Sequence, residues 1–150
     1  MRGIRRLALL AGVALAATAC GGSGGEAVAP GGTGATGPGS AGTCPASANL
    51  PTPVKDHGAA VATGSSVSIE AGDSFFAPTC VTDLPAGSIT LTVRNSGRAL
   101  HNVTVESLGI DEDVAAGQTI TVTVRVGSSP LPFFCKYHRT SGMVGALLPA

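Results

Sequence analysis

The stretch Thr119–Val126, which reads TITVTVRV, decides the fold class of this chain. Every second residue in it is apolar, and these residues are Ile120, Val122, Val124 and Val126. Successive side chains of a β-strand point to opposite faces, so this pattern predicts a strand with one buried face and one solvated face. Valine, isoleucine and threonine also favour strands by propensity.

Similar alternation recurs on both sides of this stretch, with turn-forming residues between the repeats. The expected strands are Ser66–Glu70, Ser88–Asn95, Leu100–Glu106, Pro130–Cys135 and Met143–Leu148. No helical period is convincing beyond the first twenty residues, and Asp111–Val114 is expected to form a single turn and no more. Short strands at regular spacing predict an all-β fold, namely an antiparallel β-sandwich.

Residues 1–19 have the three parts of a secretory signal peptide. The basic residues of the first part are Arg2, Arg5 and Arg6. An apolar stretch, Leu7–Ala16, comes next, and the small residues Ala17–Ala19 form the cleavage site. Cleavage leaves Cys20 at the new N-terminus, which resembles a bacterial lipoprotein site where this cysteine receives a diacylglyceryl group. Such sites usually have leucine where Ala17 stands, so ordinary secretion is the alternative.

Residues 20–43 are interpreted as a lipid-anchored, glycine-rich linker. Ten of the twenty-two residues between Gly21 and Gly42 are glycine. Such a stretch buries too little apolar surface to order itself, and as a flexible coil it reaches roughly 25 Å. Because two acyl chains hold a protein on a bilayer, we expect the following domain to be tethered outside the cytoplasm, on the bacterial cell membrane. Without the lipid it would be a soluble secreted or periplasmic protein.

The charge of the chain excludes one class of partner. The formal net charge is zero, but loss of the signal peptide leaves six basic residues against nine acidic ones. A mildly acidic protein without a basic stripe is a poor candidate for binding nucleic acid. We expect a monomeric domain over residues 44–150 with no nucleic-acid partner.

Four cysteines require four explanations. If Cys20 carries lipid and Cys135 binds metal, Cys44 and Cys80 remain. In an exported protein such a pair is expected to form a disulfide, although two buried free thiols are the alternative. Closing this loop would stabilise the fold by about 3–4 kcal/mol in the chain-entropy model. The disulfide would also hold the segment between Cys44 and Ala62 on the sandwich.

The stretch Phe134–Met143, FCKYHRTSGM, concentrates metal-binding side chains. It places the thiol of Cys135, the imidazole of His138 and the thioether of Met143 on one short loop. A thiolate, two imidazoles and a weak thioether are the ligands of a blue-copper site. The second imidazole can come from His101, at the start of an expected strand. These residues predict a copper site that exists only in the folded chain.

The pattern Cys135-x-x-His138-x-x-x-x-Met143, together with the upstream pair His101-Asn102, resembles the cupredoxins, in particular the plastocyanin and pseudoazurin group. The resemblance covers about Ser66 to Leu148. Shorter matches are Phe76–Pro78, Pro85–Gly87 and Asn95–Gly97. The resemblance implies a Greek-key β-sandwich with one type 1 copper ion, which carries single electrons between redox partners and is not an enzyme.

The resemblance also implies roles for individual residues. His101, Cys135 and His138 would be the close copper ligands, and Met143 the long axial one. The amide of Asn102 would point at the Cys135 sulfur while its side chain braces the ligand loop.

One position departs from the family pattern. Plastocyanins often have proline between the cysteine and the histidine, where this chain has Lys136-Tyr137. The Tyr137 amide is therefore free to donate to the thiolate, and we expect a higher reduction potential than with proline.

His138 is expected to lie at the exposed end of the domain, where unidentified redox partners would dock. Four residues could supply an apolar surface around it, namely Leu100, Leu131, Pro132 and Val144. Three could add a positive rim, namely Arg98, Lys136 and Arg139. Alternatively, these charges only solvate the loops.

Other functions remain open at this level. A cysteine nucleophile with a histidine base would make Cys135 catalytic, but no orienting residue is evident. A red-copper-like site could bind a small molecule if Met143 is not a ligand. Copper storage or delivery, and zinc binding, use similar side chains. His57 is expected to be a surface residue, and Asp111–Asp113 a solvated turn.

Overall fold

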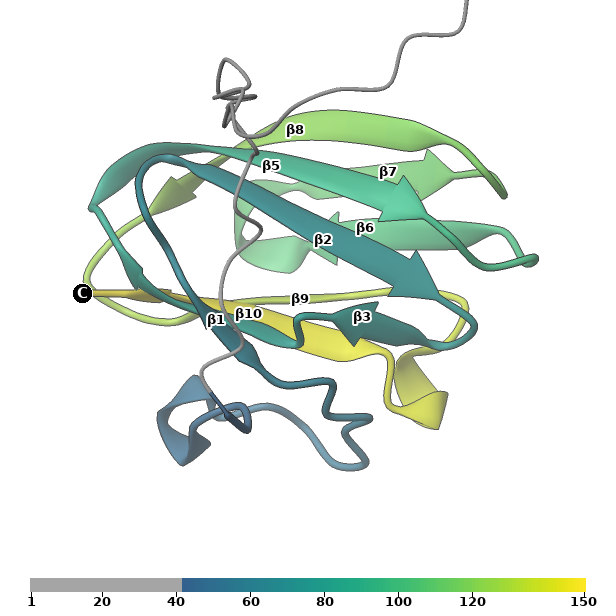
Figure 1. Cartoon of the computed structure of the whole chain (residues 1–150), viewed down its shortest axis with the longest axis horizontal. Helices are drawn as coiled ribbons and strands as arrows, with labels where there is room; N and C mark the ends of the chain where they lie inside the picture. Colours follow the sequence, from purple (N-terminus) through teal and green to yellow (C-terminus); the bar gives the residue numbers. More distant parts are fainter. Residues whose placement is uncertain (1–41) are drawn as a thin grey trace, which may run out of the picture. The chain divides into compact units, whose positions relative to one another are not determined.

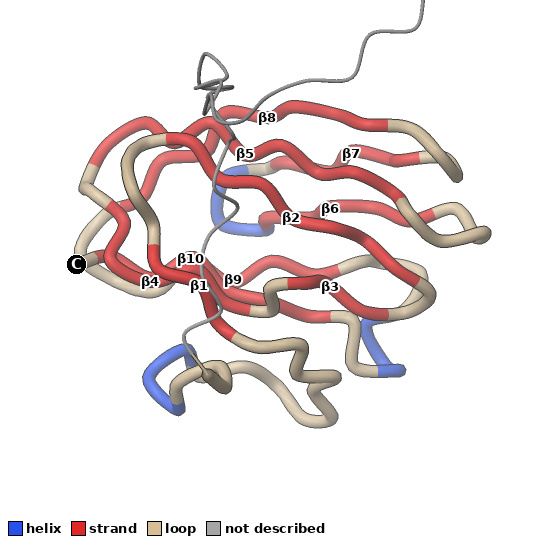
Figure 2. Tube along the Cα trace, in the orientation of Figure 1, coloured by secondary structure: helices blue, strands red, loops and turns tan. Residues whose placement is uncertain are grey.

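Two β-sheets packed face to face make up residues 42–150, the part of the chain that the computed structural model describes (Figure 1). The strand order of the larger sheet is β1 (Ala59–Val61), β4 (Cys80–Leu84), β10 (Val144–Pro149), β9 (Leu131–Phe134), β6 (His101–Val105) and β7 (Ile110–Val114). The order of the smaller sheet is β3 (Phe75–Ala77), β2 (Ser66–Gly72), β5 (Gly87–Asn95) and β8 (Thr119–Val126). The helical segments described are three 3-10 turns, at Ala46–Ala48, Glu106–Leu108 and Arg139–Ser141 (Figure 2). The prediction of an all-β sandwich is confirmed.

The stretch that decides the fold class, Thr119–Val126, is strand β8 over its whole length. It pairs with β5 in antiparallel register, from Gly87 opposite Val126 to Arg94 opposite Thr119. The apolar side chains of β5 are almost completely buried, and those of β8 are buried or half-buried against the same core. The apolar residues of β8 therefore face the core, as the alternating pattern predicted.

Both sheets are mixed, so the antiparallel pairing expected from the sequence describes most of the strand pairs but not all of them. The pairs β2–β5, β1–β4 and β4–β10 are parallel. Parallel neighbours need a crossover connection. Here the chain leaves β2, passes through β3 and then β4 of the opposite sheet, and returns to β5 beside β2.

Strand β7 corrects a second expectation. Asp111–Val114 belongs to an extended strand that pairs with β6 from Val105–Ile110 to His101–Val114, and it is not an isolated turn. Both ends of this strand are apolar: Val114 is buried, and Ile110 packs against the core. The three acidic residues between them hide the alternation in the sequence.

The core between the sheets joins side chains of both layers. Phe76 and Phe133 meet edge to face, with their ring centroids 5.0 Å apart. Cys135 and Met143 are completely buried members of the same cluster. The two sulfur-containing residues expected to bind metal therefore lie against the main hydrophobic core.

The predicted disulfide between Cys44 and Cys80 is confirmed. It belongs to a small second cluster of apolar residues, which holds the segment before β1 on the outside of the larger sheet. This segment reaches the loop of Phe134–Met143, because the Lys55 amide donates to the Gly142 carbonyl at 3.0 Å.

The signal peptide, the lipidation site at Cys20 and the linker lie outside the described residues. Within the described part, no helix has the length and apolar character to cross a bilayer.

Candidate metal centre

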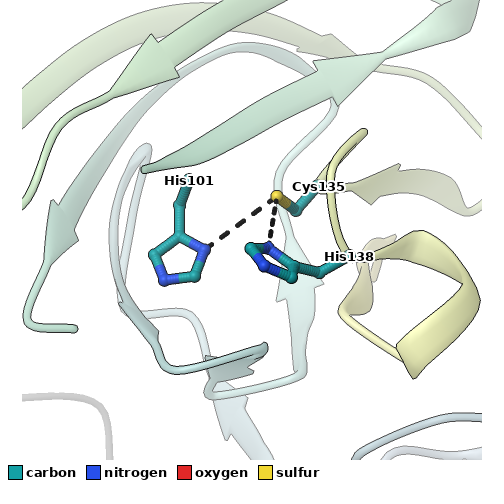
Figure 3. A group of neighbouring side chains, drawn as sticks. All are labelled: His101, Cys135 and His138. Carbon is teal, nitrogen blue, oxygen red and sulfur yellow. Dashed lines mark hydrogen bonds between the residues drawn. The ribbon is translucent and has the colours of Figure 1, made fainter. Parts of the chain in front are cut away.

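Three side chains converge at one end of the sandwich (Figure 3). His101 is the first residue of β6, Cys135 follows β9, and His138 precedes the 3-10 turn Arg139–Ser141. The Cys135 Sγ lies 3.4 Å from His138 Nδ1 and 4.0 Å from His101 Nδ1. All three ligand atoms lie within 4.8 Å of one another. A single ion could therefore contact all three.

The ligand loop, residues 135–143, is closed by hydrogen bonds within its own backbone. The Cys135 amide donates to the Met143 carbonyl at 3.1 Å, which continues the antiparallel pairing of β9 with β10. The amides of His138 and Met143 donate to the carbonyls of Cys135 and His138, at 3.1 and 3.2 Å. These bonds return the chain on itself and place Met143, which is fully buried, beside the thiol-bearing residue.

The environment of Cys135 suits a thiolate that is neutralised by a cation. Burial raises the pKa of the Cys135 thiol. The backbone amides of Tyr137, Asn102 and His138 act in the opposite direction, because they donate hydrogen bonds to the sulfur. The pocket thus disfavours a bare negative charge and still provides three donors for it.

The surroundings of the His101 imidazole favour its neutral form. Burial lowers its pKa, the neighbouring His138 lowers it further, and Asp73 raises it. A neutral imidazole is the form that binds metal ions. Together with one thiol and a second imidazole, this donor set fits copper.

Asn102 connects the ligand loop to the neighbouring strands. Its Oδ1 accepts a hydrogen bond from the Lys136 amide at 3.4 Å and another from the Thr104 hydroxyl. Its Nδ2 donates to Asp111 at 2.7 Å and to Asp113 at 3.0 Å. Every hydrogen-bonding atom of this buried amide is therefore occupied, which fixes its position.

Two carboxylates of β7, Asp111 and Asp113, also bind the ligand loop directly. The Lys136 ammonium lies 2.7 Å from Asp111 and 3.0 Å from Asp113, and the Tyr137 hydroxyl donates to Asp113 at 2.9 Å. Hydrogen bonds from Lys136 and then Asn102 lower the pKa of both carboxyl groups. Hydrogen bonds to the two carboxylates raise the pKa of Lys136. The interpretation of Asp111–Asp113 as a solvated turn is wrong in one respect: the three acids are exposed, but they lie in a strand. Asp111 and Asp113 also hold the loop between Cys135 and His138.

The surface around His138 differs from the expected one. Leu131 and Val144 are buried in β9 and β10 and cannot form an apolar docking face. Leu100 and Pro132 are exposed as expected, and Tyr137 adds another exposed side chain; Leu100 is 45% exposed and Tyr137 is 47% exposed.

The expected positive rim is largely neutralised. Lys136 is paired with the two β7 carboxylates, and Arg139 lies 3.1 Å from Glu106 while covering the Phe134 ring. Among the three basic residues of the expected rim, Arg98 alone has no ion pair within residues 42–150.

We expect the double variant Asp111→Asn, Asp113→Asn to loosen the ligand loop of the metal-free protein. The substitutions remove both charges that hold Lys136 and weaken the acceptors of the Asn102 amide. Hydrogen exchange of the Lys136 and Tyr137 amides should become severalfold faster, as measured by mass spectrometry or NMR. Glu112→Gln is the control for charge, because it removes one carboxylate from β7 without touching the loop. Equal exchange rates in all three proteins would contradict this role.

A family model described as a cupredoxin-like domain matches residues 50–148. A search of curated proteins finds no significant match. The structure is similar to reduced auracyanin from Roseiflexus castenholzii, with 17% identity, a TM-score of 0.50 and coverage of 59% of this chain and 99% of auracyanin. It is also similar to the metal-binding domain, with Cu(I), of the Cu(I)-exporting P-type ATPase CopA from Streptococcus pneumoniae. In that case the identity is 12%, the TM-score is 0.53, and coverage is 63% of this chain and 97% of that domain.

Proposed function

Because the chain belongs to the cupredoxin-like domain family, we propose that it carries single electrons between redox partners through one type 1 copper ion. The observation that carries the proposal is the convergence of His101, Cys135 and His138 within one ligand sphere. These three would be the close ligands, and the buried Met143 the weaker fourth one. When bound, copper supplies a one-electron couple between its two oxidation states.

The surrounding protein would supply rigidity. The ligand loop is held by the Asn102 amide, by the β7 carboxylates and by its own backbone hydrogen bonds, which are all contacts between protein groups. A site held in this way changes little between oxidation states, so little rearrangement accompanies electron transfer. The half-buried ring of His138 is the point at which a partner would approach. We propose docking there against Leu100 and Tyr137, the exposed large side chains of that end.

The same features argue against a nucleophilic enzyme. An activated cysteine is partially exposed and has a lowered pKa. Cys135 is completely buried, and that burial raises its pKa.

Copper delivery is the second candidate function. A structural neighbour is the metal-binding domain, with Cu(I), of a Cu(I)-exporting ATPase. A site that passes copper to another protein should let the ion leave readily. Here Cys135 and His101, two of the three proposed close ligands, are fully buried, which favours retention of the copper ion. Transfer of bound copper to a chelator within minutes would support delivery.

We further propose that the domain acts outside the cytoplasm, tethered to the cell membrane by lipid on Cys20. Support comes from the signal-like residues 1–19 and from the Cys44–Cys80 disulfide, a bond typical of oxidising compartments. Mass spectrometry of the membrane fraction from cells expressing the full chain tests this. A Cys20→Ala variant that stays in the same fraction would contradict it.

Titration of the metal-free domain with Cu(II) tests the copper assignment. We expect one equivalent to produce an intense visible band from thiolate-to-copper charge transfer, and reversible one-electron voltammetry. A colourless complex, or a copper ion that cannot be reduced and reoxidised in place, would contradict an electron carrier.

Binding of Cu(II) at pH 8 is expected to release about one proton per ion, because metal binding requires the Cys135 thiolate. Burial raises the thiol pKa, so the thiol is still protonated at this pH. The apparent affinity should therefore rise about tenfold per pH unit until the thiol pKa is reached. Calorimetry in buffers of different ionisation enthalpy measures the proton count. The Cys135→Ser variant should release none, and zero release from the wild-type protein would contradict this prediction.

A further inference from the structure

The His101 ring has one nitrogen directed at the proposed copper site and one without a partner. Its Nδ1 faces the Cys135 sulfur (Figure 3). The opposite nitrogen, Nε2, is the one buried side-chain nitrogen or oxygen without a hydrogen bond within residues 42–150. A buried polar atom without a hydrogen-bond partner lowers the stability of the fold, so each such atom requires an explanation.

Asp73 lies on the side of the ring where this nitrogen points. It belongs to the turn between β2 and β3, and its Oδ1 accepts a hydrogen bond from the Arg98 amide at 2.9 Å. A Cβ atom placed on Gly97 would lie 2.5 Å from Asp73 Oδ1 and 3.0 Å from His101 Nε2. The carboxylate and the unpaired nitrogen therefore face one another across the position where Gly97 has no side chain.

Metal binding decides which nitrogen carries the imidazole proton. If Nδ1 binds the ion, the single proton of the neutral ring must be on Nε2, which then becomes a donor that needs an acceptor. Metal-bound histidines almost always donate this proton to a carboxylate, a carbonyl or a water molecule, and the partner fixes the tautomer and the ring orientation.

Building on the proposed function, we propose that Asp73 is a positioning residue that accepts the Nε2 proton of metal-bound His101. Gly97 keeps the space between them free. A left-handed backbone does not explain the glycine, because Gly97 is not among the positive-φ residues. The close approach of Asp73 does, because an added Cβ would also lie 3.1 Å from the Asp73 backbone nitrogen. The contact would couple the β2–β3 turn, in one sheet, to a metal ligand on β6 of the other.

NMR of the domain loaded with Cu(I), which is diamagnetic, tests the proposal. The protein is labelled with ¹⁵N-histidine, and the His101 Nε2 proton is observed without oxygen. We expect a resonance protected from solvent in the wild-type protein. In Asp73→Asn and in Gly97→Ala it should move upfield and exchange at least about tenfold faster. Cu(II) affinity, from competition with a chelator, should fall by about tenfold or more in both variants.

Two matched variants control for charge and for added volume. Asp83→Asn removes a carboxylate from an exposed position on β4. Gly127→Ala adds a methyl group where nothing lies within 4 Å and the φ angle is not positive. Both controls should behave as the wild-type protein does.

Three outcomes would overturn the proposal. The first is an Nε2 proton with the same shift and exchange rate in Asp73→Asn as in the wild-type protein. The second is an equal loss of affinity in a variant and its matched control. If Gly97→Ala does not fold, the Asp73→Asn result decides. The third is a wild-type domain that binds neither Cu(I) nor Cu(II), which would remove the proposed function as well. Failure of the Asp73 contact alone would leave the visible band intact.

Discussion

Replacement of Cys135 by serine is expected to abolish the visible charge-transfer band and to weaken copper binding more than about 100-fold. Loss of an outer hydrogen-bond partner of a metal ligand already costs about 10–100-fold in affinity, and loss of the ligand itself must cost more. Cys135 is the one free cysteine within residues 42–150, so no other described thiol can replace it. Absorption titration and chelator competition measure both effects.

The metal-free Cys135→Ser variant should remain folded. Serine places an oxygen close to the point where the amides of Asn102, Tyr137 and His138 converge, so these donors keep an acceptor. Circular dichroism and thermal unfolding of the metal-free protein provide this check.

Met143→Leu is the matched control, because it replaces the other buried side chain that contains sulfur. Leucine conserves the volume of the core, and such exchanges usually cost less than about 1.5 kcal/mol. Because the thiolate stays in place, the charge-transfer band should persist while the reduction potential changes. A Cys135→Ser protein with the band intact would contradict the assignment of Cys135 as a ligand.

The sequence was sufficient to predict the strands in which every second side chain is apolar. Strand β8 matches its predicted limits, and β2, β5, β6, β9 and β10 differ from theirs by one or two residues at an end. Strands β1 and β3 have three residues each, too few to show a period. In β7 the central residues are all acidic, so its pairing with β6 is visible only in the structure.

The candidate site, like the fold, was predictable from the sequence only in part. His101, Cys135 and His138 carry metal-binding groups at recognisable spacings, and the structure brings these three together. The supporting residues have no such signal. Asp111 and Asp113 acquire their role because β7 lies beside β6 and the ligand loop folds over Asn102. The local sequence of each is that of an ordinary solvated acid, so tertiary packing alone reveals the contact.

Two of the four residues expected in the apolar face are not at the surface, for a related reason. Leu131 and Val144 are close in sequence to the candidate metal ligands, and the family resemblance suggested that they line a surface around His138. Each instead lies in a strand inside the larger sheet, between two neighbours, and is buried there. Leu131 points into the main core. Val144 lies on the other face of the sheet with Phe134 and Arg139. Proximity along the chain does not determine which face of a strand a side chain occupies, because that face alternates with every residue.

Removal of the disulfide by the double variant Cys44→Ala, Cys80→Ala is expected to lower the free energy of unfolding by about 3–4 kcal/mol. The bond closes a loop with a sequence separation of 36 residues and thereby restricts the unfolded chain. It also holds the segment before β1, since Cys80 is fully buried in β4 while Cys44 begins that segment. Urea unfolding of the metal-free protein measures the loss.

The loss of the disulfide should also loosen the contact between the segment before β1 and the candidate metal centre. The segment that Cys44 holds includes Lys55, whose amide donates to Gly142, the neighbour of Met143. Hydrogen exchange of the Lys55 amide should therefore accelerate more than that of the β5 and β8 amides, which lie in the other sheet. A reductant should destabilise the wild-type protein by the same amount and leave the double variant unchanged, which isolates the bond from the side-chain substitutions. A change below about 1 kcal/mol would mean that the sandwich restrains this segment without the covalent link, and that the ligand loop gains nothing from it.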